Sequence, residues 1–307
     1  MGGFIVSDDP NQSYETVEIL PSIVNINAII AAANNFNPLN PTVVKLSTMI
    51  LDPYVGIKEM ANLIAYDQAL TLKLLKAANS AYVGRAMRIT NVQDAISFIG
   101  EYQTLNLLLS CTLGSELLAL KLEAYKAAEG DLWHDSVLSS ITAEQAPRFF
   151  ETSVPQVATT GALLYNVGKV VMARFISGEI MEYISICKAG GKDQIEAEME
   201  ILNVHYGEIG GLIAQHWGLP HEMIVGINFH HDPDIVKSSI SDVTHICHNM
   251  VDYFRTEKGD EENAEDPVLK INPNVIERLK PNSDDWFEKL AEAVKERFEK
   301  VRSSYGL

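Results

Sequence analysis

The chain has 307 residues, of which 47% are hydrophobic, and a formal net charge of −17 from 41 acidic and 24 basic residues. This length and apolar content allow one large domain or two ordinary ones with a full core. The acidic excess repels phosphate backbones, so nucleic acid is not an expected partner.

Three cysteines, Cys111, Cys187 and Cys247, lie far apart and form no Cys-x-x-Cys pair. Their spacing favours a reducing, cytoplasmic location and offers no thiolate metal site. The first residues are polar and acidic, unlike a signal peptide. The most apolar run, Leu105 to Leu122, contains charged residues, so we expect a buried core helix there and no membrane segment.

Residues 1–38 are expected to form a lead-in that ends in a short helix over Ile23 to Ala33. Apolar stripes at helical spacing then recur throughout residues 39–125, separated by breaks such as Asp52-Pro53. No long run alternates with period two, as a half-buried strand would. We therefore predict a helical first lobe over residues 39–125.

Residues 126–255 are predicted to form a second helical lobe, which meets the first near residues 122–131. Asp131 is expected to be the N-cap of its first helix. The segment Ser153-Val-Pro155-Gln156 has the spacing of a capping box and would start the helix that contains Gly161 to Val171. Further helices are expected over Glu179 to Ala189, Gln194 to Leu202, His205 to Trp217, His221 to His230 and Ile235 to Phe254.

Residues 256–307 begin with an acidic stretch, 257–266, which holds six acids and one base and is predicted to be an exposed loop. An amphipathic helix is predicted to start at Ser283-Asp284-Asp285, and its apolar stripe is expected to cover the protein's own surface. The whole pattern predicts an all-α fold, a helical bundle of two lobes.

A polar pair, Tyr165-Asn166, interrupts the apolar stretch of the second lobe and is followed by Lys169. Polar side chains in so apolar a helix need partners, because burying them unpaired is unfavourable. All eight histidines fall between His134 and His248. The second lobe is therefore expected to contain a polar centre.

Each histidine taken alone also has a structural interpretation. His134 could be a satisfied structural residue, and His205 could cap a helix. On a helix, adjacent residues point about 100° apart, so at most one of His230 and His231 can face a given centre. A histidine in a last helical turn is also stabilised by the helix dipole.

The order of the segments is more informative than any single residue. His134, Tyr165-Asn166-Val-Gly-Lys169, His205-Tyr-Gly-Glu-Ile-Gly210, Trp217-Gly-Leu-Pro220 and His230-His-Asp-Pro233 follow one another. Together with Asn79-Ser-Ala81 and its neighbours in the first lobe, this order resembles the HDOD family, relatives of the HD phosphohydrolases and the HD-GYP phosphodiesterases. The resemblance covers roughly Leu39 to Phe254 and implies an HD-like helical domain in the C-terminal half.

In the catalytic relatives, a histidine, a His-Asp pair and a later aspartate hold a divalent metal that activates water. The resemblance matches the first histidine with His134, the His-Asp pair with Tyr165-Asn166 and the later aspartate with His248. One of four ligands is therefore kept. Lys169 matches the lysine after the pair and could meet a phosphate.

Both expected carboxylates are thus missing, and carboxylate oxygen is what Mg²⁺ and Mn²⁺ prefer. Ordinary HD hydrolysis, and a cofactor, are therefore not expected. A transition metal such as Zn²⁺, Ni²⁺ or Fe²⁺ is the alternative if imidazoles converge, with His134, His205, His230 and His248 as candidates. Otherwise Tyr165 and Asn166 are expected to hydrogen-bond to buried histidines in a metal-free network.

We expect a non-catalytic, HDOD-type signalling module that binds a protein or a small ligand in a bacterial pathway. The enzyme alternative is a metal-dependent phosphohydrolase, acting on nucleotides or cyclic dinucleotides, with an atypical histidine-rich site. A third interpretation is a metal or ligand sensor. The expected ligand-binding or vestigial site comprises His134, Tyr165, Asn166, Lys169, His205, His230, His231 and His248.

Overall fold

The computed structural model describes residues 25–80, 88–257 and 270–302, and within these ranges its regular structure is helical. Two isolated β-bridges occur there, and the same ranges contain no strand. The predicted all-α, two-lobed fold is confirmed. Most of the predicted lead-in and acidic loop, residues 1–24 and 258–269, lies outside the described residues.

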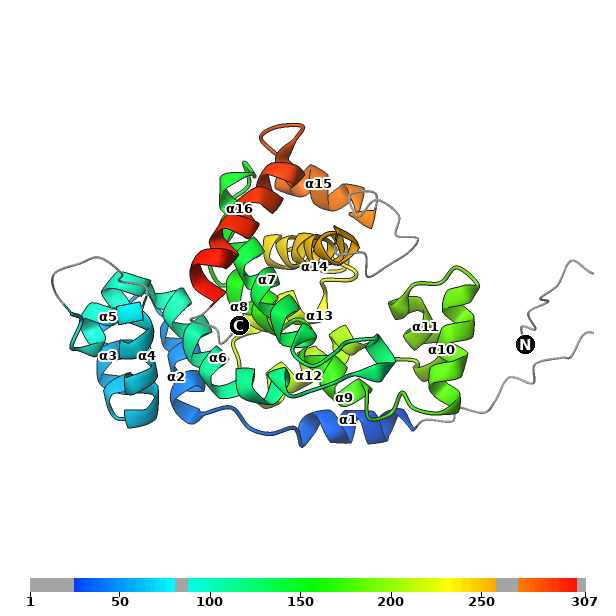
Figure 1. Cartoon of the computed structure of the whole chain (residues 1–307), viewed down its shortest axis with the longest axis horizontal. Helices are drawn as coiled ribbons and strands as arrows, with labels where there is room; N and C mark the ends of the chain where they lie inside the picture. The colour runs from blue at the N-terminus through cyan, green and yellow to red at the C-terminus, as the bar shows by residue number, and fades with distance from the viewer. Residues whose placement is uncertain (1–24, 81–87, 258–269, 303–307) are drawn as a thin grey trace, which may run out of the picture.

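The first lobe lies on the left of Figure 1. Its helices are α2 (Pro41–Met49), α3 (Ile57–Ala65), α4 (Gln68–Ser80), α5 (Val92–Ile99) and α6 (Glu101–Leu118). The preceding helix, α1 (Ile26–Asn34), instead runs along the lower edge and packs on the second lobe. There the ring of Phe36 lies 5.8 Å from that of Trp217, whose indole Nε1–H donates to the carbonyl oxygen of Asn37 at 2.7 Å.

The second lobe contains most of the remaining helices. A short 3-10 turn, η1 (Glu123–Tyr125), leads into it. Its elements are α7 (Asp131–Gln145), η2 (Ala146–Arg148), α8 (Ala158–Leu164), α9 (Val167–Met172), α10 (Glu179–Ala189), α11 (Gln194–Leu202), α12 (Tyr206–His216), α13 (His221–Asn228) and α14 (Ser239–Glu257).

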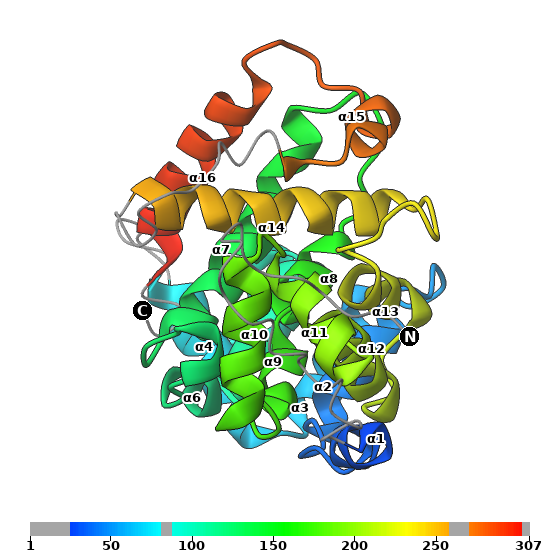
Figure 2. The ribbon, with the colours of Figure 1, turned by 90° about the vertical axis from the view of Figure 1, so that its right-hand side faces the viewer.

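Two C-terminal helices complete the chain, α15 (Pro273–Leu279) and α16 (Trp286–Val301). In Figure 2, α14 crosses the molecule beneath them. The apolar stripe of α16 is buried and packs against α7, as expected, with Phe287 and Leu290 almost inaccessible. None of the helices in the described ranges combines the length and hydrophobicity that a bilayer crossing requires.

The two lobes meet around one buried amide. Asn106 of α6 donates to the hydroxyls of Ser140 and Thr159 at 3.3 and 3.0 Å, and its oxygen accepts from the hydroxyl of Thr160 at 2.7 Å. These partners lie on α7 and α8. The amide therefore uses both donors and its oxygen within the interior, as a buried polar group should.

Several local expectations are corrected by the structure. Gly130, in a left-handed conformation, is the N-cap of α7, and Asp131 is its first helical residue. The predicted capping box before Gln156 does not cap α8, which begins at Ala158 without a side-chain cap. The predicted helix from His221 ends at Asn228, so His230 lies beyond its last turn.

The single helix predicted across Gly161 to Val171 is broken at Tyr165-Asn166 into α8 and α9. The short helix α9 lies so close to α12 that a Cβ added to Gly168 would fall 1.8 Å from the carbonyl oxygen of Tyr206. Only glycine fits at such a backbone contact. The interruption between α8 and α9 thus lies beside a tertiary contact, and the hydrophobic pattern of the sequence does not reveal such contacts.

Candidate functional site

Three histidines and two tyrosines from different segments of the second lobe form one aromatic cluster, defined here as Tyr165, Tyr206, His230, His231 and His248. The ring centroids of His230 and His231 lie 4.0 Å apart, and those of His231 and His248 lie 4.8 Å apart. Tyr165 lies edge-on to His230 at 5.2 Å, and Tyr206 edge-on to His231 at 4.9 Å. We call this the histidine–tyrosine cluster.

Hydrogen bonds identify the tautomer of His230. Its Nδ1 lies 2.8 Å from the carbonyl oxygen of Ile227, which can only accept, so the ring carries its proton on Nδ1. The second nitrogen, Nε2, then presents a bare lone pair, and it is buried without a hydrogen-bond partner. This bond also satisfies a carbonyl in the last turn of α13.

The other two histidines of the cluster are held differently. Nε2 of His231 lies 2.6 Å from the hydroxyl of Tyr206. Nε2 of His248 lies 3.8 Å from a carboxylate oxygen of Asp252, while its Nδ1 is buried without a partner. Burial lowers the pKa of all three imidazoles well below the ordinary value, because it penalises the charged form.

Lys169 provides a cation beside the cluster. Its Nζ lies over the ring of Tyr206, 4.4 Å from the centroid, and 5.4 Å from that of Tyr125. Such cation–π contacts replace part of the lost hydration. Burial, followed by the positive charge of Arg255, lowers the pKa of Lys169 to about 8. The amine is thus much closer to neutrality than an exposed lysine.

Three carboxylates surround this centre. Glu198 is fully buried and accepts the backbone N–H of Tyr206 at 2.8 Å, at the start of α12. Asp135 of α7 forms an ion pair with Arg255, at the end of α14. Burial raises the pKa of Asp135, of Glu198 and of Asp252, and nearby cations oppose this rise. The centre therefore combines weakened acids with neutral imidazoles.

Polar atoms that lack a partner concentrate here. In the described residues, the two amide atoms of Asn166, Nε2 of His230 and Nδ1 of His248 are buried without a hydrogen-bond partner. Asn166 comes directly after Tyr165, so all four atoms belong to the cluster or follow it in the chain. The expectation that Asn166 hydrogen-bonds to buried histidines is therefore wrong. The buried hydroxyls of Tyr125 and Ser139 interact instead with Glu198 and Tyr165.

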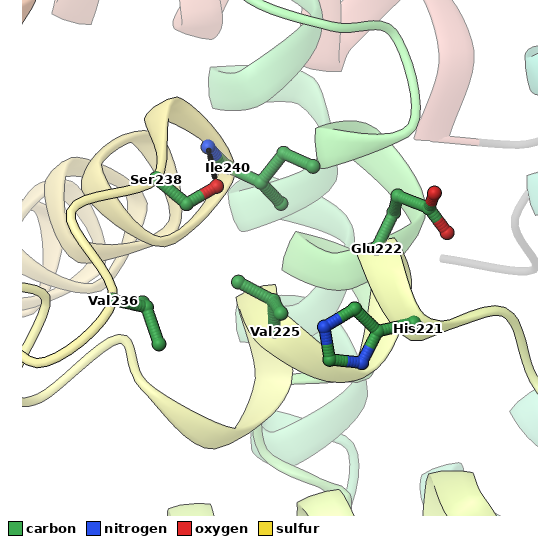
Figure 3. A pocket seen from close by; sticks show the side chains of 6 residues that line it. All are labelled: His221, Glu222, Val225, Val236, Ser238 and Ile240. Atoms are coloured by element: carbon green, nitrogen blue, oxygen red, sulfur yellow. Dashed lines mark hydrogen bonds between the residues drawn. The ribbon is translucent and has the colours of Figure 1, made fainter.

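A separate surface hollow of about 360 Å³ lies at the start of α13 and α14 (Figure 3). Its floor is formed by apolar side chains, and the exposed His221 and Glu222 lie at its rim. None of its lining residues belongs to the histidine–tyrosine cluster.

The sequence family follows from comparison with known proteins. The HDOD domain family matches residues 37–233. The chain belongs to the HDOD family.

The HDOD chain is similar to solved structures over most of its length. A proposed signal transduction protein from Marinobacter aquaeolei VT8 superposes with a TM-score of 0.67 at 18% identity, covering 92% of this chain and 65% of that one. A proposed phosphohydrolase from Shewanella amazonensis SB2B superposes with a TM-score of 0.62 at 17% identity, covering 91% of this chain and 97% of that one. At such identities the likeness shows a shared fold and nothing about activity.

One curated relative of the HDOD chain is an uncharacterized protein from Treponema pallidum strain Nichols. It is 25% identical over 296 residues, which cover 92% of this chain and 54% of the relative. The chain therefore spans about half the length of the curated relative that it matches.

The HDOD fold brings most of the residues predicted for the site together. Tyr165, His230, His231 and His248 form the cluster, with Lys169 over Tyr206. The expectation that only one of His230 and His231 could face the centre is wrong, because α13 ends at Asn228 and neither residue is on a helix. His205 lies at the edge, its ring centroid 5.6 Å from that of His231. It is the N-cap of α12: its Nδ1 accepts the N–H of Gly207 at 3.1 Å. The capping interpretation of His205 is confirmed.

His134 has a different neighbourhood. Its ring centroid lies 5.0 Å from that of Phe298, on the C-terminal helix α16. The next residue, Asp135, is the one whose carboxylate pairs with Arg255 and acts electrostatically on Lys169 and Tyr165. In this turn of α7, Asp135 is thus the residue that interacts electrostatically with the cluster.

The residues do not fit a metal centre of the HD type. Among the residues that the structure describes, no three or more histidines, cysteines or acids are arranged to hold a metal ion. His205 cannot cap α12 through Nδ1 and also offer a lone pair at Nε2, because a neutral imidazole has only one. Of the four candidates, His230 and His248 are the pair with buried nitrogens that lack a partner.

Sequence reasoning missed Asp135, Glu198, Tyr206 and Arg255. Asp135 and Tyr206 each stand next to a histidine that was singled out, and that adjacency was the available signal. Glu198 had no local signal, since other acids of its helix, such as Glu196 and Glu200, are exposed. Its contact with the backbone N–H of Tyr206, at the start of α12, distinguishes it.

Proposed function

We propose that this HDOD chain is a non-catalytic signalling module that binds a small polar ligand at the histidine–tyrosine cluster and acts on a protein partner in a bacterial pathway. The observation that supports it is the concentration, at this one place, of buried polar atoms without a hydrogen-bond partner. Native interiors contain few such atoms, and each calls for an explanation.

The chemistry of these atoms narrows the class of ligand. An unpaired buried polar atom costs about 1–3 kcal/mol. Asn166 presents one acceptor and one donor group, and Nε2 of His230 presents a second acceptor. A matching ligand carries at least two hydrogen-bond donors and one acceptor. Small neutral molecules with hydroxyl, amine or amide groups have this composition, whereas a metal ion satisfies only acceptors.

The same residues argue against phosphoester hydrolysis. Tyr165 and Asn166 stand where the catalytic relatives have a His-Asp pair, and His248 where they have an aspartate. Of the three carboxylates present, Asp135 is paired with Arg255, Glu198 accepts from the backbone of Tyr206, and Asp252 lies 3.8 Å from Nε2 of His248. A hard divalent ion that prefers carboxylate oxygen therefore finds no free set of ligands.

The test of ligand binding compares two isosteric substitutions that each remove an unpaired polar group. Thr104→Val removes the hydroxyl of α6 that lies apart from the cluster, and we expect it to leave stability unchanged or raised. Asn166→Leu should instead destabilise the protein purified with its ligand. Small molecules released from the wild type on denaturation, and absent from Asn166→Leu, are identified by mass spectrometry.

Two results would overturn the proposal. The first is an Asn166→Leu protein at least as stable as the wild type, with nothing released from either. The second is hydrolysis of a cyclic dinucleotide or a nucleoside phosphate, with Mg²⁺ or Mn²⁺, that disappears in His134→Ala. That second result would favour the enzyme interpretation.

A transition-metal sensor is the second candidate, favoured by the unpartnered nitrogens of His230 and His248, whose ring centroids lie 5.9 Å apart. Imidazole suits Zn²⁺, Ni²⁺ and Fe²⁺. Two imidazoles are fewer than the three or four protein ligands usual for Zn²⁺, so a ligand from elsewhere would be needed. Metal analysis of untagged protein decides: about one equivalent of bound metal, reduced in both His230→Gln and His248→Gln, favours this candidate.

A further inference from the structure

The helix α15 is anchored on the first turn of α14 and on the segment before it. The guanidinium of Arg278, on α15, donates to both carboxylate oxygens of Asp242 at 2.9 and 2.6 Å, and to Asp234 at 2.5 Å. The other oxygen of Asp234 accepts from the side-chain amides of Asn272 and Asn274 at 3.0 and 2.8 Å. Bidentate arginine–carboxylate pairs of this kind hold a fixed geometry. Figure 2 shows α15 beside α14.

One buried histidine connects this anchor to the histidine–tyrosine cluster. Nδ1 of His245, on α14, lies 2.8 Å from the carbonyl oxygen of His230 and must donate to it. Its Nε2 accepts the backbone N–H of Asn272, immediately before α15, at 3.1 Å. Both ring nitrogens are thus used, and the ring is only 7% exposed.

The geometry places His245 between two segments that are otherwise apart in the chain. On one side it holds the backbone of the turn that carries His230 and His231, and on the other it holds the start of α15. We propose that His245 is a positioning residue, which makes the attachment of α15 and the arrangement of His230 and His231 one coupled unit. Coupling of this kind is reciprocal: loosening either end must loosen the other.

The inference rests on the proposed function in one respect: a ligand that orders His230 would also strengthen the attachment of α15. The coupling itself is tested without a ligand, so its failure is distinguishable from a failure of the proposed ligand binding. His245→Phe keeps a ring of similar shape but neither hydrogen bond, whereas His245→Gln can still donate and accept. Val243→Ala, in the same helix, controls for general loss of stability.

Two measurements are made on the full chain. Imidazole ¹⁵N resonances report on His230 and His231, and amide hydrogen exchange reports on residues 273–279. In His245→Phe we expect both histidines' resonances to move and α15 to exchange about three- to tenfold faster, the factor for one lost hydrogen bond. His245→Gln should restore both readouts towards the wild type, and Val243→Ala should leave the resonances in place.

A substitution near α15 tests the same coupling without changing His245, in case the His245 variants do not fold. Asp234→Ala removes an acceptor of Asn272, Asn274 and Arg278, while Arg278 keeps its pair with Asp242. We expect faster exchange in α15 together with shifted His230 and His231 resonances, and neither in Lys289→Ala on the exposed face of α16. Wild-type resonances of both histidines in a folded Asp234→Ala protein whose α15 is loosened would overturn the proposal.

Discussion

Acid should unfold this protein through its buried histidines. Burial holds the pKa of His230, His231 and His248 well below the ordinary value of about 6.5, so the native state refuses protons that the unfolded chain takes up. Stability rises with pH wherever the unfolded state binds more protons. The contribution of these groups is therefore present above about pH 6.5 and is lost as the pH falls below it.

The size of the effect follows from the number of groups. An imidazole that stays neutral in the native state loses about 1.4 kcal/mol of stability by pH 5.5, one unit below its unfolded pKa. Three such groups lose at most about 4 kcal/mol, a large part of the typical stability of a domain. The raised pKa values of Asp135, Glu198 and Asp252 act in the opposite sense, since these acids take up protons in the native state first.

A single substitution isolates the histidine contribution from that of the acids. His231→Gln can still form a hydrogen bond with the hydroxyl of Tyr206, and below about pH 6 its stability should fall less steeply than that of the wild type, by about 1.4 kcal/mol per pH unit. Urea unfolding at pH 7.5, 6.5 and 5.5, with and without EDTA, measures this slope. His221→Gln, at the exposed rim of the surface hollow, is the control.

An unchanged slope in His231→Gln would refute the reasoning, because the ring would then not be a group that the fold keeps neutral. The chelator arm separates two causes of acid sensitivity. A slope that EDTA does not alter favours imidazoles that burial keeps neutral without metal, and a slope that EDTA abolishes favours bound metal, whose release also follows protonation.

Three further outcomes are expected. The pKa of Lys169 is lowered to about 8, so between pH 8 and 9.5 the native state loses a proton that the unfolded chain keeps. The stability of the wild type relative to Lys169→Met should therefore rise by about 1.5 kcal/mol over this range. A stability difference that does not change with pH in urea titrations would contradict this. Asn106→Leu should lower stability by about 2–4 kcal/mol in the same assay, since the buried hydroxyl of Thr160 loses its acceptor and those of Ser140 and Thr159 lose a donor. Gly168→Ala should prevent folding, as judged by circular dichroism, because its Cβ would meet the carbonyl oxygen of Tyr206, whereas Gly161→Ala has ordinary contacts and should fold.

The helical fold could be predicted from periodicity because most helices expose one face. The bounds predicted for residues 179–189 and 194–202 agree with α10 and α11, which are set by a glycine before the first helix and a capping box around Asp193. The interruption at Tyr165-Asn166 could not be predicted in this way, because the residues around it are buried on all sides and show no hydrophobic period. The interruption of the helix between α8 and α9 therefore left no signal in the hydrophobic pattern.

The candidate site was predictable in part. Histidine clustering located the second lobe, and the cluster of His230, His231 and His248 contains residues singled out on sequence. Nδ1 of His230 contacts a carbonyl only three residues earlier, but Nε2 of His231 contacts Tyr206, 25 residues away, and that contact depends on tertiary packing. The link from His245 to Asn272 spans 27 residues and uses a backbone N–H, a donor that every residue except proline has.

The amide of Asn106 has a mechanical consequence for the molecule. Apolar surfaces can slide past one another at small energetic cost, but this amide meets its hydroxyl partners on α7 and α8 in one register only. A swing of one lobe against the other would break several buried hydrogen bonds at once, with no water at hand to replace them. The junction at Asn106 therefore resists rotation of one lobe against the other through directional hydrogen bonds as well as through apolar packing.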